Sequence, residues 1–328
     1  MPTGQLAENE KLLYRINLKG TEKTDKEKIE ALYQQRPNTK LLGSTPYLSI
    51  YYFGKKFWNP EKVEKQIQKQ RAKYNRKIEK AGTDKERIAK LQERKEEKLD
   101  KLQLKKKEGN WFMRRLGEPP AIYDTALTNA TLDQIDIYLN SQGFFRHNVT
   151  HDTTSSEKKV TLTIKIEEDK PFVYTQHAYT IPDTAVLQLV KQNAAKSLVQ
   201  VGARYNEEDL AKERDRLENL LRNNGYFQFS KQYISFEVDT SFQDYTVRLH
   251  TVIENPTDST NHEVFRIRKV NFYTDAGASR FGIYRDTILF NNVYYLSYDH
   301  KYKPKVLDTK IDVYPGQRYR QFRTNSTQ

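Results

Sequence analysis

The residues that could perform chemistry are few and scattered along the chain. His147 and His151 are four residues apart, and in a strand this spacing separates them by about 13 Å along one face, too far to share a metal ion. We interpret Glu167-Glu168-Asp169 as a solvated strand end. Gly43-Ser44-Thr45-Pro46 lacks the lysine of a phosphate-binding loop. The 328-residue chain contains no cysteine, which excludes disulfides and thiolate sites. We therefore expect no enzyme, no cofactor and no metal site.

One segment of the chain occurs twice, at an offset of 82 residues. The offset takes Tyr123 to Tyr205 and Gly143 to Gly225. Apolar residues recur at helical spacing before each glycine, and glycine commonly ends a helix. Each copy therefore predicts an amphipathic helix, a glycine stop and an aromatic strand start. Alternating strands are expected to follow over 160–166 and 247–253.

A third, partial copy lies near the end of the sequence. Gly202-x-Arg204-Tyr205 recurs as Gly316-x-Arg318-Tyr319, after a strand expected over 265–273 and a tyrosine-rich insertion over about 277–302. The helix after this motif only begins before Gln328, so we interpret the chain as a truncated piece of a longer protein. We expect this unit to lack its second and third strands. Their absence would leave three apolar residues uncovered, namely Ile267, Val270 and Phe272.

These motifs resemble the POTRA domain, whose pattern is β-α-α-β-β with Gly-x-x-Tyr before the second helix and Leu-x-x-x-Gly-Phe/Tyr-Phe at its end. Further motifs are similar to the TamA-like lipoproteins (TamL) of the Bacteroidota: Gln35-Arg36-Pro37-Asn38, Leu41-Leu42-Gly43, Pro46-Tyr47-Leu48-Ser49-Ile50-Tyr51 and Leu116-Gly117-Glu118-Pro119-Pro120. In the BamA/TamA superfamily, POTRA arrays precede an outer-membrane barrel, which is missing from this sequence. The resemblance implies an α+β array in the periplasm, attached to the outer membrane. It also implies a non-enzymatic scaffold that binds partner proteins and outer-membrane client chains.

The resemblance and the repeats together suggest three units. We expect a first POTRA-like unit over 1–170 with a helical-hairpin insertion at about 55–110, a second over 171–256, and a partial third over 262–328. No export signal is present, and no apolar run approaches the roughly 20 residues that span a bilayer. With the resemblance, this suggests a sequence that begins after its export signal.

The insertion is expected to be an antiparallel helical hairpin with a basic surface. Asn59-Pro60-Glu61 and Thr83-x-x-Glu86 mark two helix starts. Residues 55–108 hold 20 Lys/Arg and 10 Asp/Glu, so +10 of the formal net charge of +13 lies there. One interpretation is a solvated coiled-coil surface. The other is a basic arm that contacts an acidic partner protein, anionic lipid headgroups or nucleic acid, with seven candidate residues: Lys69, Lys73, Arg76, Lys77, Arg94, Lys95 and Lys98.

Aromatic residues flank this hairpin on both sides. The preceding segment carries Tyr51, Tyr52, Phe53, Phe57 and Trp58, and the following one carries Trp111-Phe112-Met113. Our preferred interpretation is that the two segments meet and form a small core beneath the insertion. The alternative is an exposed patch for a partner or a membrane interface.

The resemblance also suggests where clients bind. In these units the first strand pairs with the third, which leaves the second at the sheet edge, over about 144–151 and 226–238. An edge strand can accept an incoming extended chain. A change of apolar parity predicts a β-bulge near Lys231-Gln232, and we favour the second unit because its edge is the longer one. The candidate residues are Lys231, Ser235 and Glu237; alternatively, Lys231 and Lys158-Lys159 protect these edges from pairing.

Two further interpretations remain open. The resemblance also implies that O-glycans can be carried at Asp-Ser/Thr followed by a small or aliphatic residue. Thr125, Thr184 and Thr287 fit this pattern, although Asp183 and Thr184 fit a helix cap equally well. The alternative function is a nucleic-acid- or ribosome-associated module built on the basic hairpin. We disfavour nucleic acid as a partner because the basic face lacks the aromatic residues on which single-stranded bases stack.

Overall fold

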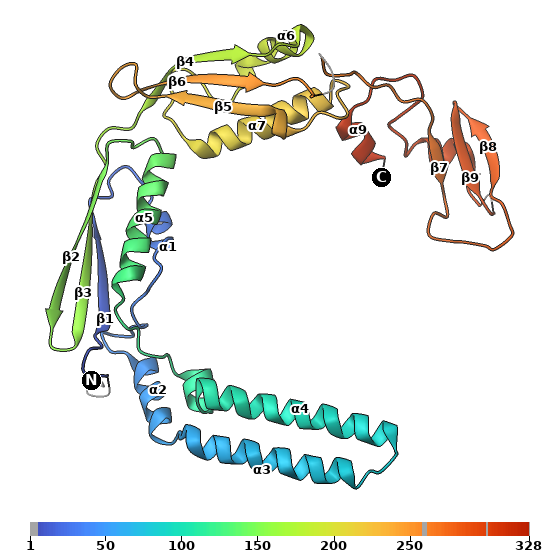
Figure 1. Cartoon of the computed structure of the whole chain (residues 1–328). Helices are drawn as coiled ribbons and strands as arrows, with labels where there is room; N and C mark the ends of the chain where they lie inside the picture. The colour runs from blue at the N-terminus through green and yellow to red at the C-terminus, as the bar shows by residue number, and fades with distance from the viewer. Residues whose placement is uncertain (1–5, 258–260, 300, 328) are drawn as a thin grey trace. The chain divides into compact units, whose positions relative to one another are not determined.

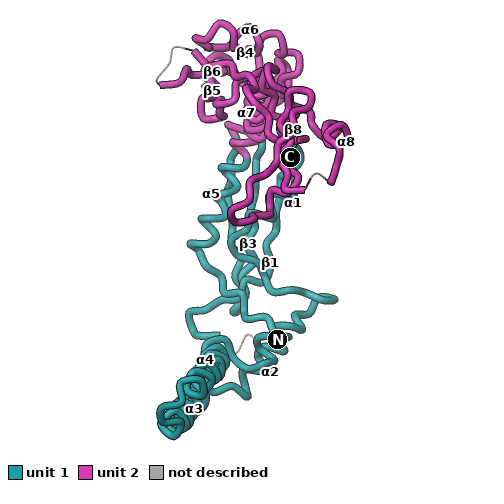
Figure 2. Tube along the Cα trace, turned by 90° about the vertical axis from the view of Figure 1, so that its right-hand side faces the viewer, with its two compact units in different colours: residues 1–138, 147–168 teal, residues 139–146, 169–328 magenta. Residues whose placement is uncertain are grey.

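The computed structural model describes residues 6–257, 261–299 and 301–327 (Figure 1). The chain divides into two compact units (Figure 2). Unit 1 comprises Met1–Tyr138 and His147–Glu168, and unit 2 comprises Leu139–Arg146 and Asp169–Gln328. The fold is α+β, and the described residues form three three-stranded sheets.

Unit 1 contains one sheet and a long insertion. Its repeat elements are β1 (Leu12–Lys19), α1 (Lys26–Ala31), α5 (Thr125–Ser141), β2 (Asn148–Ser156) and β3 (Lys159–Glu167). Between α1 and α5 lie α2 (Pro46–Lys56), α3 (Pro60–Glu79), α4 (Lys85–Glu108) and a π-helical turn, η2 (Phe112–Leu116). Helices α3 and α4 lie side by side as the expected hairpin.

Unit 2 contains two sheets in sequence. The first sheet belongs to a complete repeat, which comprises β4 (Val173–Thr180), α6 (Thr184–Gln192), η3 (Ala194–Lys196), α7 (Glu207–Arg222), η4 (Lys231–Tyr233), β5 (Ile234–Asp239) and β6 (Thr246–Ile253). The second comprises β7 (Asn271–Tyr273), β8 (Asp286–Phe290) and β9 (Val293–Ser297), followed by α8 (Pro304–Asp308) and α9 (Gln321–Ser326).

All three sheets have the same strand order. The third strand lies in the middle, parallel to the first and antiparallel to the second, which occupies an edge as expected. The central strands β3 and β6 alternate buried and partly exposed residues, because one face of each sheet packs on the core. The two complete repeats also share a register shift in the first strand, between Leu13 and Arg15 and between Tyr174 and Gln176. The β-bulge that we predicted near Lys231 is absent; a 3₁₀ turn, η4, changes the side-chain parity there instead.

The helix starts follow capping chemistry. Asn59 and Asn206 accept hydrogen bonds from first-turn amides of α3 and α7. Asp25 caps α1, and Asp84 caps α4 one residue after Thr83, where the sequence predicted the cap. A carboxylate competes better than a hydroxyl for these amides because it also interacts favourably with the helix dipole.

The third sheet corrects our expectation of missing strands. The tyrosine-rich insertion forms β8 and β9, and before the chain reaches the Gly-x-Arg-Tyr motif, β9 pairs with β7 and β8 pairs with β9. Val270 and Phe272 pack against buried Val293 and Tyr295 of β9, so they are not left uncovered. The first strand is also shorter than predicted, since only Asn271–Tyr273 pairs in the sheet.

The aromatic pair after each repeat glycine lies in a turn, not in a strand as predicted. In unit 2, the Gly143 carbonyl accepts the Phe172 amide at 2.8 Å, and the Phe145 ring contacts the rings of Phe172 and Tyr205 at 5.0 and 5.1 Å. The arrangement recurs where the Gly225 carbonyl accepts the Phe265 amide at 2.8 Å and the Phe227 ring contacts Phe265 and Tyr319 at 5.7 and 4.9 Å. We call this arrangement the repeat joint. At Gly143 a Cβ would lie 2.8 Å from the Tyr205 carbonyl oxygen, so the joint requires glycine.

Candidate partner-binding surfaces

No group of three or more His, Asp or Glu side chains within the described residues is placed to hold a metal ion. Within the same residues, no helix combines the length and the apolar character needed to cross a membrane. His147 contacts Asp136, and His151 lies on β2.

The prediction that the acidic segment Glu167-Glu168-Asp169 is solvated was wrong for Glu168. It is buried, not solvated, and its carboxylate accepts the amides of Glu22, Lys23 and Thr24 at 3.2, 2.6 and 3.0 Å. These donors belong to the loop after β1, so the carboxylate fixes that loop against the end of β3. Its role is structural.

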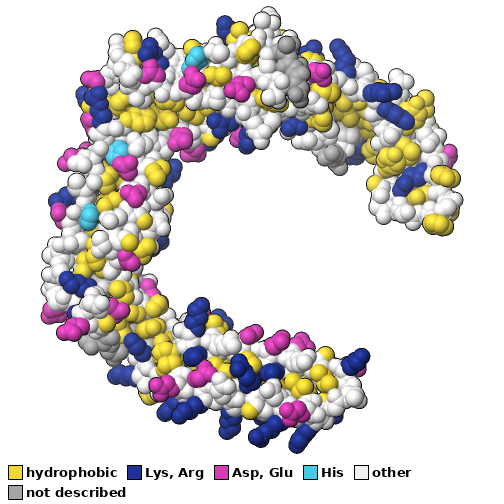
Figure 3. All heavy atoms as spheres, in the orientation of Figure 1, with side chains coloured by type: hydrophobic (Ala, Val, Ile, Leu, Met, Phe, Trp, Pro, Cys, Tyr) yellow, Lys and Arg dark blue, Asp and Glu magenta, His cyan; other side chains and the backbone are white. Residues whose placement is uncertain are grey.

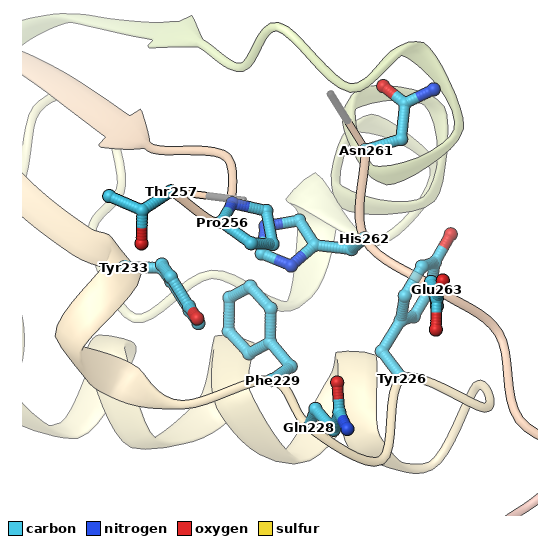
Figure 4. Close-up of a pocket in the computed structure, with 9 residues that line it drawn as sticks. All are labelled: Tyr226, Gln228, Phe229, Tyr233, Pro256, Thr257, Asn261, His262 and Glu263. Carbon is cyan, nitrogen blue, oxygen red and sulfur yellow. The ribbon is translucent and has the colours of Figure 1, made fainter. Parts of the chain in front are cut away.

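A cavity of about 330 Å³ in unit 2 is lined by aromatic residues around His262 (Figure 4). The imidazole lies 4.9 and 5.0 Å from the rings of Phe229 and Tyr233. Its Nε2 bonds the Glu254 carbonyl, which makes this nitrogen the donor, and its backbone amide donates to Asp183. Asp183 also caps α6, so the histidine ties the segment after β6 to the start of that helix. Nε2 and the backbone amide of His262 thus bond neighbouring segments of unit 2.

These contacts predict a pH dependence of stability. Burial lowers the pKa of His262, and it also lowers that of His177, below the usual value of about 6.5. The unfolded chain therefore binds more protons just below that pH, so stability is fully present above about pH 6.5 and declines as the pH falls through the window below it. We expect the thermal midpoint of unit 2 to fall between about pH 7 and about pH 5.5. The decline should be shallower in His262→Gln than in the control His151→Gln, and equal slopes would contradict this account.

The seven basic candidates lie on the hairpin as the sequence indicated. Four belong to α3 and three to α4, and none forms an ion pair with a carboxylate in the described part of the chain. Lys95 instead donates to the Asn75 side chain at 2.7 Å. The hairpin core is short, because Val63, Ile67 and Leu99 are buried whereas the apolar residues nearer its tip are partly exposed. In Figure 3, Lys and Arg side chains cover the length of the hairpin.

The two aromatic segments beside the hairpin do meet, but only part of them is buried. Tyr52 and Met113 are inside, with 3% and 4% exposure. Phe53, Phe57 and Trp111 remain 51%, 71% and 55% exposed, as in the alternative that we ranked second. The reason is helical geometry: α2 turns only Leu48, Tyr52 and Gly54 inward, so neighbouring aromatics face outward.

The pairing of β5 with β6 determines which backbone groups of β5 point outward from the sheet. Tyr233 and Glu254 lie opposite each other, and the Glu254 amide donates to the Tyr233 carbonyl at 2.9 Å. In an antiparallel pair such hydrogen-bonded positions alternate, so Ser235 and Glu237 bond β6. The outward N–H and C=O groups therefore belong to Ile234, Phe236 and Val238. Ser235 and Glu237, our sequence candidates, expose their side chains but not their backbone, and Lys231 pairs with Asp215 at 3.3 Å in η4.

The edge of β2 is longer than that of β5, contrary to our prediction. It has nine residues against six, because η4 takes up the start of the expected β5 strand. The two-residue turn at Glu157-Lys158 joins the paired residues Ser156 and Lys159, which places Thr153 among the outward positions. Lys158 donates to the Leu6 and Ala7 carbonyls, so it does not guard this edge.

The three candidate glycosylation threonines are all exposed. Thr125 and Thr184 are the first residues of α5 and α6, each after an aspartate whose carboxylate accepts first-turn amides. Thr287 lies in β8. Asp124 and Asp183 thus cap these two helices, and glycosylation of the three threonines stays a prediction.

Comparison with known proteins gives structural likeness but no sequence family. No family model and no curated protein matches the chain. It is similar to BamA POTRA domains 3–5 of Haemophilus influenzae, with 10% identity over 99% of this chain and 86% of that one and a TM-score of 0.35. It is similar to POTRA domains 1–3 of the periplasmic domain of Omp85 from Anabaena, with 14% identity, 64% and 71% coverage and a TM-score of 0.26. For CdiB of Escherichia coli the values are 7% identity, 78% and 29% coverage, and 0.27.

Proposed function

We propose that this chain is a non-enzymatic scaffold of POTRA-like units that binds client chains in the periplasm, in an outer-membrane protein assembly or translocation system. The observation that carries the proposal is the strand order shared by all three sheets, which puts the second strand of each at an edge. The short motifs that resemble TamL support the same assignment. The basic hairpin is a further contact surface of this scaffold.

The two outer edges of each complete sheet differ in a way that favours the second strand as the binding edge. The first strand is partly covered, because Leu12 forms a bridge with Ile122 and Val173 forms one with Arg204. No strand within the described residues pairs with the outer side of β2 or β5. Backbone groups on these strands can therefore bond an extended client whatever its side chains, as a scaffold for many clients requires.

Proline substitutions test this proposal because the amides of β2 and β5 that face outward from the sheets are known. Val238→Pro and Thr153→Pro remove outward amides and leave the bonds to the neighbouring strands intact. We expect both variants to fold, and a double variant to bind an extended amphipathic strand peptide about five-fold more weakly, since a client at either edge loses one amide hydrogen bond that contributes roughly 1 kcal/mol. Binding is measured by fluorescence anisotropy, and folding by circular dichroism.

Glu237→Pro and Ser235→Pro are the matched controls for β5. Each removes an amide that bonds β6, so we expect lower stability without the same direct loss of an edge donor. Parent-like peptide affinity in the folded double variant Val238→Pro/Thr153→Pro would show that these edges are not the client site.

A further inference from the structure

Four exposed aromatic rings gather where the hairpin joins α2. Phe53 and Phe57 come from α2 and its end, and Trp111 and Phe112 come from the segment after α4. The rings of Phe53 and Phe112 meet at 5.7 Å, and those of Trp111 and Phe112 at 5.3 Å. With Lys105 and Arg114 they line a groove of about 520 Å³. We call these four rings the aromatic platform.

The platform has a rigid base. Gly54 packs so closely that a Cβ there would lie 2.8 Å from both the Asn110 side-chain oxygen and Met113. The side-chain amide of Asn110 donates to the Gly54 carbonyl at 2.6 Å, and the Trp58 indole donates to the Lys105 carbonyl at 2.9 Å. The exposed rings are thus held in place before any partner arrives, which reduces the entropy lost on binding.

Cations surround the platform almost without anions. Residues 53–58 and 104–116 contain seven Lys/Arg and one Glu: Lys55, Lys56, Lys105, Lys106, Lys107, Arg114, Arg115 and Glu108. Lys106 pairs with Glu64 at 2.9 Å, and the other six cations form no ion pair within the described residues. In Figure 3, hydrophobic side chains gather at the base of the hairpin beside Lys and Arg. This charge opposes binding of a second copy through the same face, because like charges would meet.

The combination of rings and cations fits the surface of an anionic bilayer. Trp and Phe insert at the boundary between headgroups and acyl chains, and Lys and Arg bind the phosphates above them. Single-stranded nucleic acid is a poorer match, because its successive bases stack on separate ring faces. Here the ring planes of adjacent pairs cross at 66°, 86° and 83°, so the edge of one ring lies against the face of its neighbour. Ring faces covered in this way cannot stack on a base.

We propose that the aromatic platform and its surrounding lysines and arginines form a docking site for an anionic phospholipid bilayer. The rings enter the interfacial layer and the cations bind lipid phosphates. This proposal is independent of client binding at the sheet edges, because it uses other residues of unit 1. Docking at the platform would also bring the basic hairpin close to the bilayer, where the lysines and arginines of α3 and α4 add positive charge.

Vesicle sedimentation with the full chain tests the site. We expect binding to vesicles that contain phosphatidylglycerol, weakening as salt is added, and little binding to phosphatidylcholine alone. Phe57→Ser/Trp111→Ser should weaken binding about ten-fold or more through loss of interfacial apolar area. Lys55→Glu/Lys56→Glu/Arg114→Glu/Arg115→Glu should weaken it at least as much. Ile137→Ser, which changes an exposed apolar residue of unit 1 elsewhere, should bind like the parent.

Further variants and ligands distinguish the platform from the hairpin, and a bilayer from nucleic acid. Reversal of the seven hairpin residues from Lys69 to Lys98 should have a smaller effect than reversal at the platform. Vesicle binding unchanged in the Phe57/Trp111 variant would overturn the proposal, and so would binding that needs only the hairpin cations. Binding of single-stranded oligonucleotides in physiological salt that needs the rings, without binding to vesicles, would replace the bilayer with nucleic acid. An emission blue shift on vesicles that is lost in Trp111→Phe would support insertion directly.

Discussion

Replacing Glu213 by alanine is expected to lower the unfolding free energy of unit 2 by about 3–5 kcal/mol. Glu213 lies on α7 and is completely buried. Its carboxylate receives two hydrogen bonds from the Arg216 guanidinium, both at 2.7 Å, and one from the Leu198 amide at 2.9 Å. Alanine would leave a largely buried arginine without its counter-charge and a backbone amide without an acceptor.

The control for this substitution lies on the same helix. Glu208 pairs with Lys212 at 2.8 Å, but both side chains are more than half exposed. Glu208→Ala should therefore cost less than about 1 kcal/mol. Urea unfolding followed by circular dichroism compares the two variants directly. Similar losses for both would mean that burial of the Glu213 pair adds nothing to its strength.

Gly20→Ala is expected to destabilise unit 1 by roughly 3 kcal/mol. Gly20 follows β1 with φ of +86°, and a Cβ there would lie 1.9 Å from the Ile166 carbonyl oxygen in β3. The left-handed backbone costs alanine about 1–2 kcal/mol, and the shift needed to relieve the overlap adds about 1–3 kcal/mol. Thermal unfolding of the full chain should show the loss.

Gly82→Ala separates these two contributions. Gly82 also has positive φ, +60°, but nothing lies within 4 Å of a Cβ built there. We expect about 1–2 kcal/mol for this variant, which is the cost of the left-handed backbone alone, confined to the hairpin turn. If Gly20→Ala were no worse than Gly82→Ala, the close approach to Ile166 would not constrain unit 1.

Local signals in the sequence predicted much of the fold. Polar caps and helical periodicity placed α3 and α7, and strict alternation placed β3 and β6. The strand order followed from the resemblance to POTRA domains and agrees with the structure. What local signals missed were contacts between distant segments. Glu168 is buried because its donors lie about 145 residues earlier, which no neighbouring residue indicates.

The candidate binding surfaces were less accessible to sequence analysis. Which amides of β5 face outward depends on the register with β6, and side-chain parity alone cannot fix it. Phe53 and Tyr52 are adjacent aromatics of similar size, yet only the second is buried, because the helix rotation sets which one faces the core. The strand pair over 286–297 was hidden because an insertion supplies strands that the repeat pattern places later.

The repeat joint has a consequence for how such an array can evolve. One repeat carries the glycine and aromatic pair at the end of its second helix, and the next supplies the strand start and the Gly-x-Arg-Tyr loop that bind them. Gene duplication in whole repeats therefore copies both halves of the joint together. The joint is also head-to-tail, so added repeats can only continue in the direction already set. Whole repeats can thus be gained or lost by recombination without redesign of any interface, because each new boundary again joins a glycine end to a strand start.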